Sequence, residues 1–389
     1  MKNAFRWNPH ADQPHNVAPK SERFKQHLKY LDSYAYILIS NLAKIGPGLK
    51  RYRKLRKNIY QNPVKISDPF ALCFSPSNDH NEDICACFEE LGVKQGLFRI
   101  PSWEINKLPL YDKTLDLFLS KGIDITIALL QQRSDVLDPA KWSNFLEIVF
   151  SRFQKKCRRF EIGHAWNRTK WGVWDYREYL KLIKPAVPLA RKYDIQMIGP
   201  SVIDFEFHLY PAVLKAAPFD IISSLLYTDR VGAPENTQFG WDLSKKIALL
   251  RAAVDVCSDP QKELWVTEFN WPLKGTGKYS PVSGRPNVTE QEQSDYLARY
   301  YLLGSSSGYI QKIFWWQLIA PGYGLIDNRK KEWRKRPAYY AFKTLIAQLK
   351  GSTFTHRIPH PSAYIFFFEK AGHTFSACWT NDAPSMFEF

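Results

Sequence analysis

The chain lacks the features that would place it in or across a membrane. None of its apolar runs reaches the ~18 residues that a transmembrane helix needs. Residues 1–10 also lack the apolar core of a secretory signal. We therefore expect a cytoplasmic protein, with peripheral attachment to the inner face of the membrane as an added feature.

Cysteine is scarce and its spacing indicates no framework. The six cysteines stand apart, without the pairs that zinc sites or disulfide-rich domains use. The two nearest, Cys85 and Cys87, are too close for a usual disulfide or a metal pair. Reduced and mostly buried thiols are expected, and neither a metal nor another cofactor is implied.

Acidic residues are rare at the N-terminus. Residues 1–66 hold 14 Lys or Arg against 3 Asp or Glu, so this segment carries +11 of the net charge of +16. Six of the eight residues 50–57 are basic, and residues 21–43 before them show helical apolar spacing. Residues 21–57 therefore predict a peripheral contact with an anionic membrane. The alternatives are a solvated basic arm packed on the domain and a nucleic-acid contact, which nothing else in the chain supports.

The same segment carries two local signals. Residues 1–20 are rich in Asn, Pro and His without periodicity, which predicts a flexible arm. Gly46, Pro47 and Gly48 are expected to end the helix that begins near Ser21.

Aromatic residues are plentiful, and the rest of the chain alternates strands with helices. An apolar fraction of 45% with 13 Trp, 20 Tyr and 25 Phe is typical of a globular protein. No GxGxxG loop follows the first expected strand, so a doubly wound nucleotide-binding sheet is disfavoured. The pattern predicts a (β/α)₈ TIM barrel in the α/β class, with functional groups at the C-terminal ends of its strands. The expected strands are 70–75, 96–100, 123–130, 159–163, 195–202, 219–227, 263–269 and 310–318, and the expected helices are 82–91, 111–120, 138–155, 175–193, 211–217, 242–256, 289–303 and 336–349.

Three parts follow from this division. Residues 1–66 form a basic, helical N-terminal extension, and residues 67–350 form the barrel. Residues 351–389 supply small C-terminal β-strands, with a hairpin expected at 363–368 and 374–380 because these runs alternate in polarity.

Glu268 is the leading candidate for chemistry. It lies near the end of an apolar strand that stops at Pro272, and a carboxylate there is costly unless it is paired or used. The alternative is a structural ion pair at a strand end.

The other strand ends carry the rings and amides that hold sugars. Aromatic rings cover pyranose faces and amides bond hydroxyl groups, whereas a phosphate or metal site would need clustered cations or acids. Ordinary packing is the alternative for each ring taken singly. The candidates are Arg99, Trp103, Glu104, His164, Asn167, Tyr227, Asn270, Trp316 and Gln317.

Residues 68–349 resemble the (β/α)₈ retaining glycoside hydrolases of the 4/7 superfamily, especially the xylosidase/iduronidase-like branch. Residues 265–270 (WVTEFN) match the strand-7 motif of that family, and 322–327 and 336–341 resemble its final segments. The resemblance implies Glu268 as the nucleophile, Arg99 as the residue that keeps it ionised, and Trp316 as the floor of the sugar site.

The resemblance fails at the fourth strand. Residues 160–163 (FEIG) match the family, but Ala165 then stands where the general acid/base Glu is expected, and His164 replaces the preceding Asn. Leu225 likewise replaces a sugar-binding His. Three interpretations stay open: the leaving group needs no acid, hydrolysis has been lost, or the acid comes from elsewhere, the candidates being His164, Glu104, Asp204, Glu206 and Asp229.

The sequence thus predicts a glycoside hydrolase-like protein that acts on a cell-envelope saccharide, anionic or lipid-linked. Glu268 is the expected nucleophile, and His164 is either a substrate contact or a substitute acid. The alternative is a catalytically impaired protein that binds saccharides or serves as a scaffold, because alanine cannot protonate a leaving group.

Overall fold

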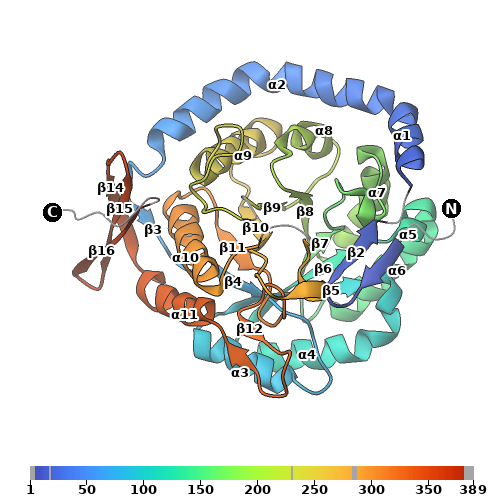
Figure 1. Ribbon diagram of the computed structural model, residues 1–389. Coiled ribbons are helices and arrows are strands. Elements are labelled where there is room, and N and C mark those ends of the chain that lie inside the picture. Colours follow the sequence, from blue (N-terminus) through green and yellow to red (C-terminus); the bar gives the residue numbers. More distant parts are fainter. Residues whose placement is uncertain (1–4, 17–18, 229–230, 283–286, 381–389) are drawn as a thin grey trace.

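Eight parallel strands close into a barrel in the computed structural model, which describes residues 5–16, 19–228, 231–282 and 287–380 (Figure 1). Neighbours in the barrel are also neighbours along the chain, and the last strand pairs with the first. The strands are β4 Phe70–Cys73, β5 Gln95–Pro101, β6 Asp124–Leu130, β7 Arg159–Ile162, β8 Gln196–Ile203, β9 Ile221–Leu225, β10 Leu264–Phe269 and β11 Lys312–Trp315.

Helices follow the strands and surround the barrel, which confirms the predicted fold class (Figure 1). The strands are buried on both faces, and for that reason they appear in the sequence as continuous apolar runs. The surrounding helices are α3 Asn81–Leu91, α4 Leu108–Ser120, α5 Arg133–Leu137, α6 Pro139–Phe153, α7 Tyr176–Tyr193, α8 Tyr210–Leu214, α9 Leu243–Cys257, α10 Glu290–Ser306 and α11 Pro337–Leu349.

Short elements line the loops. The 3₁₀ turns are η1 Ser102–Lys107, η2 Thr169–Trp171, η3 Phe207–Leu209 and η4 Gly277–Tyr279. A small antiparallel pair, β12 Ile326–Asp327 and β13 Arg334–Lys335, leads into α11. Among the described residues, no helix is both long enough and apolar enough to cross a bilayer.

The N-terminal arm is ordered as a hairpin, so the prediction of a flexible arm was wrong for residues 5–16. β1 Phe5–Asn8 pairs with β2 Gln13–Asn16 and lies over the barrel mouth (Figure 1). The Trp7 ring packs against Trp103 and Trp171, at centroid distances of 5.4 and 6.1 Å. These long-range ring contacts stabilise strands too short to show periodicity. Residues 1–4 and 17–18 lie outside the described part.

The extension then forms α1 Lys20–Lys29 and α2 Leu31–Asn58. The expected helix end at Pro47 was wrong, because α2 continues through it. Anchors on both sides of the proline hold the helix to α9: Lys44 Nζ donates to the Val256 carbonyl at 3.2 Å, and Arg51 pairs with Asp255 at 2.5 Å. Tertiary contacts therefore outweigh the local cost of the proline.

The C-terminal strands form a larger sheet than the predicted hairpin. β14 Thr353–Ile358, β15 Ala363–Lys370 and β16 His373–Thr380 form an antiparallel sheet, and β3 Val64–Lys65 adds a fourth strand beside β14. This sheet joins the end of the N-terminal extension to the C-terminal region.

Candidate functional site

Glu268 lies at the mouth of the barrel, near the C-terminal end of β10, and is 6% exposed. Arg99 Nη2 donates to its Oε2, and the Tyr227 hydroxyl donates to its Oε1 at 2.5 Å. His164 Nε2 lies 3.3 Å from Oε2. Burial raises the pKa of Glu268, but Arg99 above all, with His164 and Tyr227, outweighs burial and holds the pKa at about 2. The carboxylate is therefore ionised at neutral pH, as a nucleophile must be.

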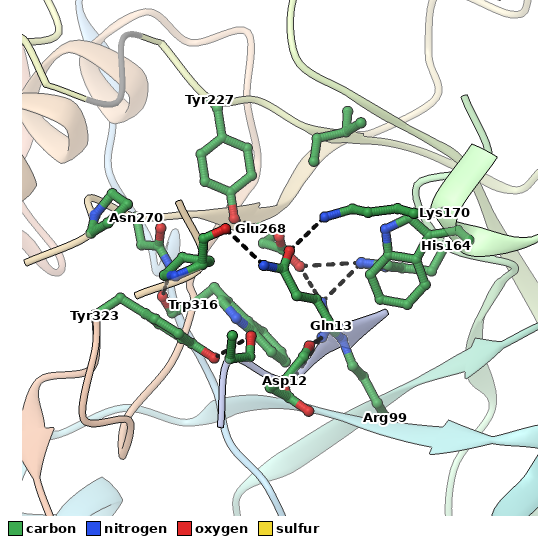
Figure 2. A pocket seen from close by; sticks show the side chains of 15 residues that line it. Asp12, Gln13, Arg99, His164, Lys170, Tyr227, Glu268, Asn270, Trp316 and Tyr323 are labelled. Atoms are coloured by element: carbon green, nitrogen blue, oxygen red, sulfur yellow. Dashed lines mark hydrogen bonds and ion pairs between the residues drawn. The ribbon is translucent and has the colours of Figure 1, made fainter. Parts of the chain in front are cut away.

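Arg99 links the groups around this carboxylate. It comes from β5, its Nη2 lies 2.9 Å from His164 Nε2, and its guanidinium lies 3.4 Å from the centroid of the Trp316 ring. Asn270 Nδ2 donates to the Trp316 carbonyl at 2.6 Å, which fixes the loop after β11 against the loop after β10. Residues at or after the ends of β5, β7, β9, β10 and β11 thus surround one buried anion (Figure 2).

A sharp turn after β7 directs His164 toward Glu268. Gly163 has a φ of 78°, and a Cβ there would lie 2.9 Å from the Tyr179 ring, so glycine is required. Gln131 holds the His164 backbone from both sides, accepting from its N–H at 2.8 Å and donating to its carbonyl at 2.9 Å. Within β7, before this turn, Glu161 Oε2 lies 3.8 Å from His164 Nδ1.

The surroundings of Ala165, where the resemblance to the glycoside hydrolases would place the general acid/base, are mostly apolar. Ala165 is fully buried in a cluster whose other members are Leu130, Trp171, Ile203, Leu225 and Tyr227.

The alternative acids are engaged elsewhere. Asp204 and Glu206 both pair with Arg168. Glu104 accepts from Lys107 and from the Tyr111 hydroxyl, each at 2.8 Å. Asp229 lies outside the described residues. Of the groups proposed as substitute acids, His164 lines the cavity with Glu268.

The tip of the N-terminal hairpin enters the site. Arg99 Nη1 donates to Asp12 Oδ2 at 3.4 Å, and Gln317 Nε2 donates to the same oxygen at 2.9 Å. Gln13 accepts from Lys170 Nζ at 2.5 Å. Asp12 and Gln13 thus lie among Arg99, Lys170 and Glu268 (Figure 2).

The hairpin leaves little free space. The remaining cavity has a volume of about 50 Å³, far below the roughly 300 Å³ at which ligand pockets begin. Burial raises the pKa of Asp12 from 3.8 to about 6, although Arg99 opposes the shift. The side chain is 27% exposed. A second carboxyl group therefore opens into the same cavity as Glu268, and it is supplied by the hairpin.

The predicted substrate contacts divide into two groups. Arg99, His164, Tyr227, Asn270 and Trp316 line the cavity with Glu268. The other four lie around it: Gln317 holds Asp12, Trp103 packs on Trp7, Glu104 bonds Lys107 and Tyr111, and Asn167 bonds Glu206 and the Ile203 backbone.

Sequence reasoning missed five polar or aromatic residues that line the cavity: Asp12, Gln13, Lys170, Trp171 and Tyr323. Lys170 and Trp171 follow the fourth strand in the same loop as Asn167, so a longer reading of that loop would have included them. Tyr323 lies in the segment 322–327 that resembled the hydrolases. Nothing local in the sequence marks Asp12 or Gln13.

A metal site is not evident in the same region. In the described ranges, no three His, Cys, Asp or Glu side chains gather as metal ligands would.

Comparisons with solved structures find glycoside hydrolases. A family 39 glycoside hydrolase from the gut symbiont Bacteroides cellulosilyticus WH2 aligns with a TM-score of 0.63 and 17% identity, over 81% of this chain and 71% of that one. The family 1 β-glucosidase of Thermotoga maritima gives 0.54 and 14%, over 74% and 99%. A GH51 arabinofuranosidase from Xanthomonas axonopodis pv. citri gives 0.53 and 15%, over 84% of each chain.

In comparisons of sequence, no family model and no curated protein matches the chain. At these identities the structural matches establish architecture and leave chemistry to be argued from the site. With its closed eight-stranded barrel and its surrounding helices, the chain has the (β/α)₈ fold of these glycoside hydrolases.

Proposed function

We propose that the protein is a glycosidase-like enzyme in which the Glu268 carboxylate attacks the anomeric carbon of a bound saccharide. The observation that carries this proposal is a buried carboxylate, held ionised by Arg99 at the barrel mouth beside the Trp316 ring. Attack forms a glycosyl ester on Glu268 and expels the leaving group with its bonding electrons. Water then cleaves the ester.

The leaving group in this proposal departs without a protein acid. The alanine side chain of Ala165 carries no proton to donate, and loss of an acid/base group costs an ordinary glycoside about 10²–10⁴-fold in rate. A phosphate or an acidic hydroxyl leaves as an anion and avoids this cost. Among the glycoside hydrolases, we place the chain beside the xylosidase/iduronidase-like branch, with Ala165 at the acid/base position.

The saccharide would take the place of the hairpin tip. Asp12 and Gln13 now bond the cationic and amide groups that sugar hydroxyls would use, namely Arg99, Lys170 and Gln317. Since the free cavity is about 50 Å³, substrate entry requires the hairpin to withdraw. The hairpin is thus an internal competitor for the site.

We further propose that the substrate is a cell-envelope saccharide, anionic or lipid-linked, reached from the cytoplasmic side. The basic extension supports this assignment, since residues 1–66 carry a net charge of +11. The structurally similar hydrolases support sugar binding in general: one matching β-glucosidase is in complex with deoxynojirimycin.

The test uses a panel of 2,4-dinitrophenyl glycosides, whose phenol leaves without acid help. A variant lacking residues 1–19 should release phenol from at least one member, and added azide should accelerate turnover by trapping the glycosyl ester. Glu268→Gln in the same background should abolish release. Unchanged turnover in that variant would contradict the assignment of the nucleophile.

A saccharide-binding or scaffolding protein is the second candidate, and fully buried Ala165 favours it. In that case the truncated protein would bind members of a sugar and iminosugar panel in calorimetry, yet release no phenol with any glycoside. Glu268→Gln would then weaken binding of cationic iminosugars without any effect on turnover.

A further inference from the structure

Exposed apolar side chains are concentrated on the N-terminal extension. Sixteen large apolar residues are exposed in the described part of the chain, and ten of them lie between Phe24 and Leu49. The other six are scattered over the barrel and the C-terminal sheet. Single exposed apolar residues are ordinary, but a contiguous set marks an interaction surface.

The apolar residues of α2 form one stripe. Their spacing of three or four residues places them along a single helix face, and each is 45–60% exposed. The adjoining face holds the helix to the barrel through Asn41, which donates to the His208 carbonyl at 2.8 Å, and through Arg51 and Leu55. The stripe consists of Leu31, Tyr34, Leu38, Leu42, Ile45 and Leu49.

An apolar groove lies between this stripe and the barrel helices. Its volume is about 370 Å³, and Leu38, Leu42 and Ile45 face Phe207 and Leu249 across it. α2 runs along the outside of α8 and α9 (Figure 1), so the groove opens on the side of the barrel.

The second half of the same helix is basic. Lys50, Arg53, Lys54 and Lys57 are exposed, and none of the four forms an ion pair within the described ranges. α2 therefore presents an apolar half followed by a cationic half along one rod of about 42 Å.

We propose that α1 and α2 dock on an anionic lipid bilayer. The apolar stripe enters the interfacial region, where such helices bury their apolar face about 5–10 Å deep. The exposed Lys and Arg side chains bind anionic headgroups, each contributing attraction near the surface. A bilayer offers hydrocarbon and anionic charge side by side, which the two halves of α2 require together.

Charge disfavours the competing occupants. A second copy of the chain would bring two extensions of net charge +11 into contact. A nucleic acid would pair with the basic half and leave the apolar stripe exposed to water. The docking surface lies on the outside of α8 and α9, away from the Glu268 cavity, so this proposal does not depend on the chemistry at Glu268.

The test is cosedimentation of the full chain with vesicles of phosphatidylcholine, either alone or mixed with phosphatidylglycerol, at physiological ionic strength. The wild type should bind the mixed vesicles and leave the neutral ones free. At about 1 kcal/mol for each basic residue, removal of four charges should lower the partition coefficient by about 10³-fold. The charge variant is Lys50→Gln, Arg53→Gln, Lys54→Gln and Lys57→Gln.

A matched control separates this surface from the overall positive charge. Four lysines elsewhere on the barrel are exposed and form no ion pair in the described ranges; their replacement removes the same charge and should lower partitioning less than tenfold. A third variant, Leu38→Gln with Leu42→Gln and Ile45→Gln, should also lose binding while keeping its circular dichroism spectrum. The control substitutions are Lys113→Gln, Lys155→Gln, Lys181→Gln and Lys184→Gln.

Three outcomes would overturn the proposal. The wild type could fail to bind anionic vesicles, or the charge variant and the control could lose binding equally, which would reduce the effect to net charge. Sedimentation equilibrium could also show a dimer that the apolar variant dissociates, which would make the stripe an interface between copies. With residues 1–19 removed from each variant, turnover of soluble aryl glycosides should be the same in all of them, so failure of docking is distinguishable from failure of the proposed chemistry.

Discussion

Protonation of Asp12 should control how firmly the hairpin closes the site. In the inserted hairpin the pKa of Asp12 is about 6, and 3.8 is its ordinary value in water. Because the inserted form has the higher pKa, protons favour insertion. The stabilisation is complete below pH 3.8 and is lost as the pH rises through about 6. At 1.36 kcal/mol per pKa unit, the difference is about 3 kcal/mol, or roughly 10² in the ratio of withdrawn to inserted hairpin.

The opening equilibrium can be measured without knowing the ligand. Ala11 is 4% exposed at the hairpin tip, so an Ala11→Cys thiol would react with a pyridyl disulfide only when the hairpin withdraws. Peptide mass spectrometry follows this site separately from the other thiols. The exposed native Cys378 reports the effect of pH on thiol reactivity in the same sample.

After this correction, the opening constant should be roughly 10² larger at pH 7.5 than at pH 4. Asp12→Asn imitates the protonated side chain, so its opening constant should stay near the wild-type value at pH 4 throughout. Glu268 does not contribute to the difference between the two pH profiles, because its pKa is about 2. His164 is present in both proteins, so it cannot account for a difference between them. Parallel pH profiles with and without the Asp12 carboxyl would refute the reasoning.

Three further changes test the site. Arg99→Met leaves the Glu268 carboxylate buried without its cation, which should lower the free energy of unfolding at pH 7 by about 3–5 kcal/mol in urea titrations. Adding Glu268→Gln to this variant should restore most of the lost stability. If stability did not recover, Arg99 would act mainly through packing. Trp7→Ala removes the ring contacts with Trp103 and Trp171, so the Ala11→Cys thiol should react at least tenfold faster in the open-state assay; an unchanged rate would mean that these rings do not hold the hairpin. Ala165→Glu, in the chain lacking residues 1–19, should raise the turnover of glycosides with poor leaving groups by about 10²–10⁴-fold. The turnover of dinitrophenyl glycosides should be nearly unchanged. A folded variant without this selective gain would show that the leaving group lies elsewhere.

The barrel was predictable because its signals are local. Each strand is buried on both faces and appears as an apolar run, and each helix shows its own periodicity and ends. Once eight such units alternate, closure places the strand ends together, so residues as distant as Arg99 and Glu268 could be assigned to one site from the sequence. The structure brings these two side chains into contact.

The hairpin and the long helix were not predictable in this way. Residues 5–16 have short strands without periodicity, and their position depends on Trp7, Asp12 and Gln13 fitting a surface built by distant loops. Pro47 signals a helix end, yet contacts with α9 on either side of it keep α2 continuous. Such outcomes depend on which surfaces meet, and that information is absent from a local window.

By itself, the sequence determined the barrel, the strand-end position of Glu268 and the absence of a carboxylate at Ala165, because each of these depends on short-range pattern or on residue identity. Only the tertiary structure decided what occupies the site. The N-terminal hairpin places the Asp12 carboxyl in the Glu268 cavity. Arg99 and Gln317 donate hydrogen bonds to this carboxyl, and the Trp103 and Trp171 rings pack against Trp7.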